Sequence, residues 1–214
     1  MPFRVVYLVD EDAASRRALA AILAGLGIEL WPFPSTAAFR QVAARLEPSC
    51  ILLNGGPSSF HALTRLKELV DTGAGWPIIL AGGRQDIRTA LDAVRIGAVD
   101  YVELPPDEDQ LARAFAHAEV ELARSRLADG ARRAAQERLA GLTPREQEIL
   151  LALMAGMSNK LVAHELAISV RTVEMHRSNI LRKLGIGNLA EGAVLMMEAG
   201  MMPDRSARPG FGRH

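Results

Sequence analysis

Several polar side chains in the first half of the chain directly follow short apolar runs. Asp10, Glu11 and Asp12 come after residues 5–9, and Asn54 follows a later run. Carboxylates at such a position either gather a weakly held cation or stabilise the start of the next helix, and both interpretations stay open. An amide has no anionic oxygen with which to attack and adds no charge to a metal site. Asn54 therefore supplies neither an anionic nucleophile nor a charge for a metal at this position.

The same edge offers little for enzymatic chemistry. Asn54 and His61 form no base–nucleophile pair, and Gly82-Gly83 is too short a glycine run to cradle a phosphate. We expect no catalytic residue, no metal and no other cofactor, and an enzyme is the least favoured class.

The second half carries polar side chains on one side of a predicted helix, residues 170–184. At 100° per residue, this polar side consists of Arg171, Met175, Ser178, Asn179 and Arg182. The apolar side consists of Val170, Val173, Ile180, Leu181 and Leu184. Arginine neutralises phosphate and shorter polar groups reach base edges, so the polar side predicts a contact with the DNA major groove. Arg177 falls toward the apolar side, where we expect an ion pair with Glu148 or Glu165.

The elements that must position these groups alternate regularly over the first 120 residues. Strands are predicted at residues 5–9, 28–33, 50–53, 77–81 and 99–102. Helices are predicted at residues 13–26, 35–46, 59–70 and 86–96, with a fifth that starts near residue 106. Five such β-α units with nearly continuous apolar strands predict a parallel sheet covered on both faces, with polar groups gathered at its carboxyl edge.

A different pattern follows. Residues 121–140 are rich in Ala and Arg and are predicted to form a helical linker outside any core. Residues 141–203 form a second module, and residues 204–214 are expected to be a flexible tail. Thr143-Pro144-Arg145-Glu146 combines an N-cap, a proline at the first helical position and a capping-box glutamate. Helices are predicted over residues 144–155, 159–166, 170–184 and 189–199, a spacing typical of a helix-turn-helix.

Composition agrees with two small globular modules. The 214 residues are 49% hydrophobic and 23% charged, which excludes a disordered chain. The single cysteine, Cys50, excludes a disulfide framework. No run approaches the roughly 20 apolar residues of a membrane span, and no signal peptide is evident, so we expect a cytoplasmic protein without a membrane partner. The net charge is zero overall, slightly acidic before residue 120 and slightly basic after it, as for a nucleic-acid-binding second module or for ordinary solvated surface.

Three segments of the second module resemble the LuxR-type DNA-binding domain. They are LTPREQEIL at residues 142–150, GMSNK at 156–160 and ISVRTVEMHR at 168–177, closed by RKLG at 182–185. With the β-α units in front, residues 3–200 resemble a FixJ/NarL-type response regulator. The resemblance implies an α/β flavodoxin-like (βα)5 receiver domain over residues 1–120, followed by an all-α four-helix helix-turn-helix domain. It also implies double-stranded promoter DNA and a second copy of the chain as partners.

Receivers of this family transfer a phosphoryl group to an aspartate, aided by Mg²⁺, a hydroxyl group and a lysine. The resemblance places Asn54 at the aspartate position, Gly82 at the hydroxyl and Leu104 at the lysine, beside Asp10 and Glu11. Three required residue types are absent together, which predicts a degenerate site that accepts no phosphoryl group.

Two neighbouring features keep open interpretations. Tyr101 matches the aromatic switch position of the family, and it could equally be a partly exposed ring at the sheet edge. Leu104-Pro105 matches a place where receivers keep a cis proline, and the sequence allows either isomer.

The resemblance also implies DNA contacts. Lys160 and Thr172 correspond to phosphate-binding positions, and Glu174, Met175 and Ser178 to positions that face bases. Relatives often carry a cation where this chain has Glu174 and Ser178, so the target sequence does not transfer. The full set of candidate DNA-contacting residues is Lys160, Arg171, Thr172, Glu174, Met175, Ser178, Asn179, Arg182 and Lys183.

A regulator that accepts no phosphoryl group needs another means of controlling its dimer. The resemblance implies a dimer face on the fourth helix, fifth strand and fifth helix, and its candidate residues are Arg88, Leu91, Asp92, Arg95, Asp100 and Arg113. We expect Asp100–Arg113 and Asp92–Arg95 pairs across a two-fold axis, the alternative being solvated charges of little worth. The expected function is a transcription regulator of atypical two-component type, controlled by dimerisation or by a protein such as a sensor kinase. The alternative is an adaptor that binds a sensor kinase or another regulator through the first module.

Overall fold

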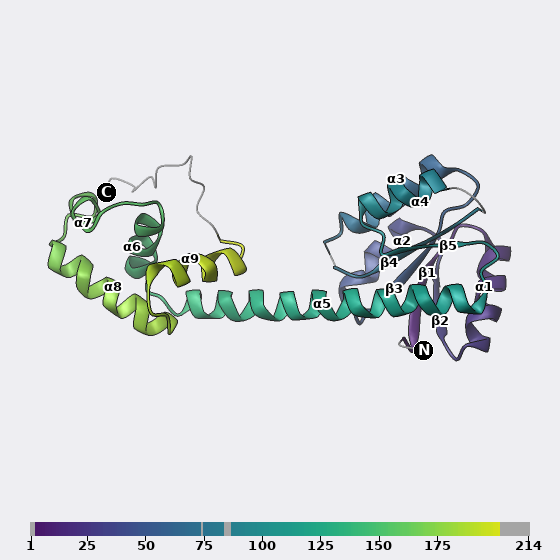
Figure 1. The fold of residues 1–214 in the computed structure, drawn as a ribbon, viewed down its shortest axis with the longest axis horizontal. Helices are drawn as coiled ribbons and strands as arrows, with labels where there is room; N and C mark the ends of the chain where they lie inside the picture. Colours follow the sequence, from purple (N-terminus) through teal and green to yellow (C-terminus); the bar gives the residue numbers. More distant parts are fainter. Residues whose placement is uncertain (1–2, 74, 84–86, 202–214) are drawn as a thin grey trace. The chain divides into compact units, whose positions relative to one another are not determined.

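A computed structural model describes residues 3–73, 75–83 and 87–201 of the chain. The tail expected at residues 204–214 lies outside these residues. The chain divides into two compact units, Met1–Arg126 and Leu127–His214 (Figure 1). Each unit has its own apolar core.

The first unit contains a five-stranded parallel sheet in the order β2-β1-β3-β4-β5. Its strands are β1 (Val5–Val9), β2 (Glu29–Phe33), β3 (Cys50–Asn54), β4 (Ile78–Gly82) and β5 (Asp100–Glu103). The predicted α/β class and parallel sheet are confirmed. Asn54 pairs with Ala81, and Gly82 pairs with Glu103. Because neighbouring strands are parallel, Asn54 and Gly82 lie with the other candidate receiver-site residues at one carboxyl edge of the sheet.

Helices cover both faces of this sheet. They are α1 (Ala13–Gly25), α2 (Thr36–Val42), the 3₁₀ helix η1 (Ala43–Arg45), α3 (Ser59–Val70), α4 (Ile87–Ile96) and α5, which begins at Glu108. Side-chain oxygens of Asp12, Ser35 and Ser58 accept backbone N–H groups at the starts of α1, α2 and α3. These caps satisfy donors that no helical carbonyl reaches, so they fix where each helix begins.

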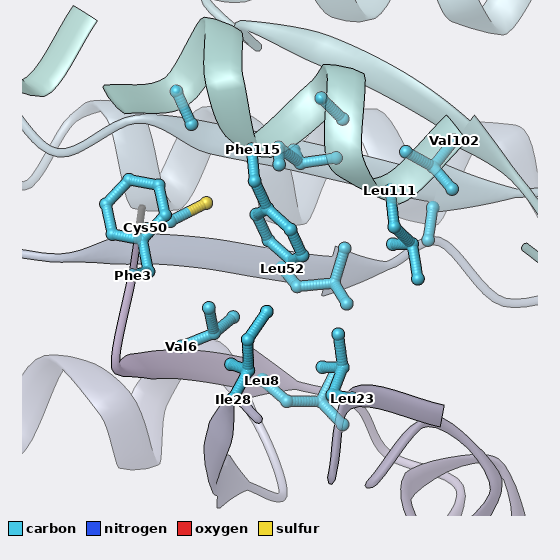
Figure 2. Packing of buried hydrophobic residues seen from close by; sticks show 14 of the residues in the cluster. Phe3, Val6, Leu8, Leu23, Ile28, Cys50, Leu52, Val102, Leu111 and Phe115 are labelled. Carbon is cyan, nitrogen blue, oxygen red and sulfur yellow. The ribbon is translucent and has the colours of Figure 1, made fainter. Parts of the chain in front are cut away.

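Alternation along the strands builds a core on each face. In β1, Val6 and Leu8 point to the cluster with α1 and α5, whereas Tyr7 and Val9 point to the cluster with α2, α3 and α4. Figure 2 shows the first cluster, in which Leu111 and Phe115 of α5 lie over the sheet. Phe115 also meets Phe3 edge to face, with ring centroids 6.1 Å apart.

Helix α5 runs from Glu108 to Ala140, so it includes the segment predicted as a linker. The linker is helical as expected, but the expectation that it lies outside any core is wrong. Ala135 and Leu139 are buried in the core of the second unit, and their spacing of four residues places them on the same side of α5. Gln136 donates a hydrogen bond of 3.1 Å to the Ala199 carbonyl, and the Arg138 guanidinium donates to the Leu184 carbonyl.

The rest of the second unit consists of α6 (Pro144–Met154), α7 (Asn159–Glu165), α8 (Val170–Leu184) and α9 (Leu189–Glu198). The predicted capping box at Thr143 and Glu146 is present, and Ser158, Ser169 and Asn188 cap the other three helices. Gly185 ends α8 with φ of 60°, a left-handed conformation that suits glycine. The predicted all-α helix-turn-helix unit is confirmed.

Candidate functional site

The carboxyl edge of the sheet is organised around Asn54, which is only 6% exposed. Its Nδ2 donates to Asp10 Oδ2 at 2.9 Å and to Ser15 Oγ at 2.8 Å, and its Oδ1 accepts the Gly56 N–H at 3.0 Å. The amide orientation follows from chemistry, because a backbone N–H can only donate and an ionised carboxylate can only accept. All the strong hydrogen-bonding groups of Asn54 are therefore used inside the protein.

The acidic triplet does not act as one cluster. Asp10 is buried and also accepts the Asp12 N–H at 2.8 Å. Asp12 caps α1 through the Ser15 and Ala14 N–H groups, and these bonds lower the pKa of its carboxyl group. Glu11 instead faces Arg65, with Nη1 and Oε1 3.4 Å apart. The helix-cap interpretation is confirmed for Asp12, and across the described residues no three His, Cys, Asp or Glu side chains are placed to share a metal ion.

Arg65 was not identified from the sequence. Its side chain is 14% exposed, and its Nη2 donates to the Gly55 carbonyl at 2.6 Å. It thus brings a positive charge from α3 to the loop after Asn54. Nothing in the local pattern of α3 distinguishes this arginine from a solvated one, because its partners lie 10 and 54 positions away in sequence.

Tyr101 occupies the space in front of Gly82. Its hydroxyl group donates to the Gly83 carbonyl at 2.9 Å. A Cβ atom added at Gly82 would overlap the Tyr101 hydroxyl oxygen and would lie 3.0 Å from the ring carbon that bears it. The ring and any side chain larger than hydrogen at position 82 therefore compete for one volume. The partly exposed ring expected at the sheet edge is present, and it lies against Gly82 and Gly83.

Leu104 ends this edge with an apolar side chain. It is half-buried and packs against the cluster shared with α1 and α5. The Leu104–Pro105 peptide bond is cis, one of the two isomers left open by the sequence.

The helix-turn-helix of the second unit is built by α7, a short turn and α8. The turn passes through Ala167, whose φ is 51°, and the Arg145 guanidinium donates to the Leu166 carbonyl at 2.6 Å. Arg145 also pairs with Glu148 at 2.9 Å. Within the described residues Arg177 forms no ion pair, so its expected pairing with Glu148 or Glu165 is wrong. Glu148 is instead paired with Arg145, three residues before it on the same helix.

Helix α8 has the two sides expected, except that Leu181 is only half-buried and Val170 is exposed. Val173, Ile180 and Leu184 are buried in the core, whereas Val170 is 37% exposed because it lies at the first turn, beyond the packed helices. The residues of its exposed face are Arg171, Glu174, Met175, Ser178 and Arg182. Asn179 is half-buried and accepts a hydrogen bond of 3.1 Å from Arg182. Thr172 lies 2.8 Å from the Ser169 hydroxyl at the start of the helix.

The two lysines among the candidate DNA-contacting residues differ. Lys160 is exposed in the first turn of α7. Lys183 donates from its Nζ to Glu146 Oε2 at 2.7 Å, and Glu146 is 4% exposed. Burial opposes the charge of Glu146, but Lys183 and the Thr143 N–H and hydroxyl groups outweigh it and lower the pKa of Glu146 to about 2. Lys183 therefore neutralises a buried charge of its own domain, which the sequence pattern did not indicate.

Comparison with known proteins accounts for both units. A family model described as bacterial regulatory proteins, luxR family, matches residues 140–196, and one described as flagellar regulatory protein FleQ matches residues 5–120. The transcriptional regulatory protein FixJ of Azorhizobium caulinodans is 33% identical over 95% of this chain and 97% of its own. The chain belongs to the FixJ-type response regulators.

Other response regulators are similar to this chain over most of their length. The response regulator protein TodT of Pseudomonas putida is 31% identical over 87% of this chain and 82% of its own. The solved structure of the response regulator StyR is 28% identical, with a TM-score of 0.61 over 91% of this chain and 98% of that one. The first unit is thus a receiver domain, and the second is a LuxR-type DNA-binding domain.

Two acids of the candidate dimer face of this FixJ-type receiver have partners within the chain. Arg95 pairs with Asp92 on the same helix, with Nη1 and Oδ1 3.1 Å apart. Asp100 Oδ2 lies 2.8 Å from His117 Nδ1 of α5. The pairs Asp100–Arg113 and Asp92–Arg95 across a two-fold axis stay a prediction. Arg88 and Arg113 are exposed.

The same face carries an apolar stripe that the sequence analysis captured only through Leu91. Ile87, Leu91 and Val94 of α4 are 71%, 56% and 56% exposed. Their spacing of four and three residues places them on one side of the helix, and this spacing was the available signal. They line a shallow pocket of about 270 Å³ together with Asp100 and Tyr101.

In the described part of the chain, no helix has the length and apolar character that crossing a bilayer requires.

Proposed function

We propose that this FixJ-type regulator binds promoter DNA and is controlled without aspartyl phosphorylation. The observation that carries the proposal is the hydrogen-bond network of Asn54, whose amide nitrogen is 2.9 Å from Asp10 and 2.8 Å from Ser15. In a site that accepts a phosphoryl group, an anionic oxygen must face the phosphorus, and a cation would offset the negative charge of the carboxylates. Here an N–H donor meets the Asp10 carboxylate where that cation would be needed, and no anionic oxygen is available at position 54.

Two further residues support the same conclusion. A new phosphoryl group needs a hydroxyl and a cation to balance its oxygens. Gly82 supplies no hydroxyl, and the Tyr101 ring fills the space in which one would stand. Leu104 supplies an apolar side chain that packs on the core. A change of Asn54 alone would therefore leave two of the three required groups missing.

The test is incubation of the full chain with acetyl phosphate and Mg²⁺, followed by intact mass measurement. We expect no phosphoryl adduct, and we expect affinity for DNA to be unchanged by the treatment. The matched variant Asn54→Asp should be labelled only weakly, because the hydroxyl and lysine are still missing. A base-labile adduct on any carboxylate of the wild-type chain would contradict the proposal.

For DNA recognition we propose that α8 enters the major groove. Arg171 and Lys160 contact phosphates together with Thr172, while Met175, Ser178 and Glu174 face base edges. The exposed positions of Arg171, Met175 and Ser178 on one side of a capped helix support this arrangement. Asn179 and Arg182, which are hydrogen-bonded to each other, lie toward the far end of the same face. Since Lys183 is held by Glu146, we assign it a stabilising role first.

For control we propose a homodimer on the α4–β5–α5 face, with the apolar stripe of α4 at its centre. Burial of exposed Leu and Ile side chains supplies a non-directional attraction that solvated ion pairs do not. Sedimentation of wild type should give a dimer at micromolar concentration without phosphorylation. Leu91→Asp should dissociate it, while Phe60→Asp, at a still more exposed apolar residue on α3, should not. A wild-type monomer, or equal dimerisation of both variants, would refute this interface.

The adaptor function remains a second candidate, because an exposed apolar stripe binds another protein as readily as a second copy. Gel-shift titration on genomic fragments at physiological salt separates the two. Sequence-selective binding supports the regulator, and absence of any DNA binding by the dimer supports the adaptor.

A further inference from the structure

A pocket of about 580 Å³ lies in the receiver domain at the edge of the sheet opposite Asn54. It opens beside the amino ends of β1 and β3, and four separate segments line it: the start of β1, Trp31 of β2, residues 45–49, and the part of α5 that includes Leu122, Ala123 and Arg126. We call it the lower pocket. Its volume lies within the range of sites that hold small organic molecules.

The walls of the lower pocket are aromatic and aliphatic. Tyr7 and Trp31 meet edge to face with centroids 6.0 Å apart, and Phe3 and Leu122 complete the apolar lining. Trp31 is 43% exposed, a large apolar surface for a tryptophan in a folded domain. Such walls favour a flat apolar ligand, since aromatic rings bury a large area with few rotatable bonds.

The hydroxyl and indole groups of these walls already have partners. The Tyr7 hydroxyl donates to the Glu47 carbonyl at 2.8 Å, and the Ser49 hydroxyl donates to the Val5 carbonyl at 2.6 Å. The Trp31 indole N–H donates to Glu29 at 2.7 Å. Polar recognition of a ligand is therefore left to the charged side chains of the rim.

That rim is rich in arginine. Arg4, Arg45 and Arg126 line the pocket against Glu47 and Glu119, which leaves an excess of positive charge. Arg126 donates from Nη2 to the Pro48 carbonyl at 3.1 Å, which holds its guanidinium across the pocket between α5 and the 45–49 segment. Within the described residues no ion pair occupies Arg4, Arg45 or Arg126. A guanidinium at the edge of an apolar site is suited to a carboxylate, which it binds through two parallel hydrogen bonds.

We propose that the lower pocket binds a small molecule with a flat apolar body and one carboxylate, and that this molecule is an input signal of the regulator. The ligand lies on Trp31 and Leu122 and pairs with the rim arginines. Helix α5 forms one wall of the pocket, so the ligand has different affinities for conformations that differ in how α5 packs on residues 45–49. Binding therefore shifts the populations of these conformations. Only this regulatory meaning rests on the proposed phosphorylation-independent function; binding itself does not.

The experiment is calorimetric titration of the full chain, without DNA, with 2-naphthoate and with its uncharged analogue 2-naphthalenemethanol. We expect one saturable site for 2-naphthoate. The double variant Arg45→Gln and Arg126→Gln should weaken 2-naphthoate about tenfold, by loss of a charge-assisted bond, and leave the alcohol nearly unchanged. Arg124→Gln is the matched control, because Arg124 is on the same helix but pairs with Glu121 outside the pocket; this variant should bind both probes as wild type does.

Two substitutions at the exposed Ala123 complete the test. Ala123→Trp fills the pocket and should abolish binding of both probes, whereas Ala123→Glu adds an anion at the rim and should weaken 2-naphthoate alone. Absence of saturable binding by wild type overturns the proposal, as does a double arginine variant that loses neither probe or both equally. These measurements are independent of the acetyl phosphate assay, so either proposal can fail while the other stands.

Discussion

Asn54→Asp places a second carboxylate beside Asp10, and the consequences follow from the observed contacts. In the wild-type chain the Asn54 amide nitrogen lies 2.9 Å from Asp10 Oδ2, with both residues nearly inaccessible to solvent. The substitution replaces this attraction by the repulsion of two charges and removes the donor to Ser15. We expect the receiver domain to lose stability at neutral pH.

The size of the loss can be bounded in two ways. Two unit charges about 3 Å apart repel by about 5 kcal/mol at an effective dielectric constant of about 20. The new carboxyl group can instead bind a proton, which from an unfolded pKa of about 3.9 costs about 1.4 kcal/mol per pH unit, or about 5 kcal/mol at about pH 7.5. Loss of hydrogen bonds alone, as in Asn54→Ala, costs about 1–3 kcal/mol. Asn54→Asp should therefore be less stable than Asn54→Ala by about 2–4 kcal/mol at this pH.

The difference should depend on pH in one direction. The neighbouring charge raises the folded-state pKa of the introduced carboxyl group above its unfolded value, so the folded variant binds more protons in the window between the two. Its stability then falls as pH rises from about 4 through the raised pKa and levels off above it. Millimolar Mg²⁺ should restore part of the loss in Asn54→Asp and none in Asn54→Ala, because only the former has two facing carboxylates.

Urea unfolding followed by tryptophan fluorescence measures this effect selectively. The chain has two tryptophans, Trp31 and Trp76, and both are in the receiver domain. Midpoints and slopes for wild type, Asn54→Asp and Asn54→Ala, measured from about pH 4, near the unfolded pKa, to about pH 8, give the free energies of unfolding. If Asn54→Asp matched Asn54→Ala at every pH, the close approach of Asn54 and Asp10 would be refuted as an electrostatic contact.

Three further outcomes are expected. Glu146→Gln should cost the DNA-binding domain about 3 kcal/mol at neutral pH, since the pKa of Glu146 is lowered to about 2; in wild type this stability is present above about pH 4.5 and lost as pH falls toward about 2, which urea unfolding followed by far-UV circular dichroism would show. Gly82→Ala should drive the Tyr101 ring out and break its bond to Gly83, so that in a fluorotyrosine-labelled chain, which has two tyrosines, only the Tyr101 resonance moves; an unmoved resonance would contradict the competition for space. Arg171→Ala and Lys160→Ala should each lower the salt dependence of DNA affinity by about one unit, Met175→Ala should change site preference instead, and Lys183→Gln should alter stability more than the salt dependence.

The sequence was informative wherever a structural decision is local. Thr143 and Glu146, Ser158 and Ser169 predict helix starts because capping involves residues within three positions of one another. The strands were predicted equally well, because a parallel sheet buried on both faces requires nearly continuous apolar runs. Asn54 was predicted to lack an attacking oxygen because the residue type alone decides that its side chain is uncharged. The helix-turn-helix was predicted from the spacing of its helices and from the segments that resemble the LuxR-type domain.

Tertiary structure decided whatever depends on which partner a side chain selects among several. Asp92 and Asp100 lie beside Arg95 and His117 of their own chain, and the sequence analysis named neither contact as one within the chain. Ala135 and Leu139 entered a core that their arginine-rich surroundings did not indicate, because two apolar residues suffice where neighbouring helices supply the rest. The partners of Asn54, the ring of Tyr101 over Gly82 and the lower pocket each join segments distant in sequence. Long-range contacts of this kind arise from the packing of finished elements, and no local pattern of residues encodes them.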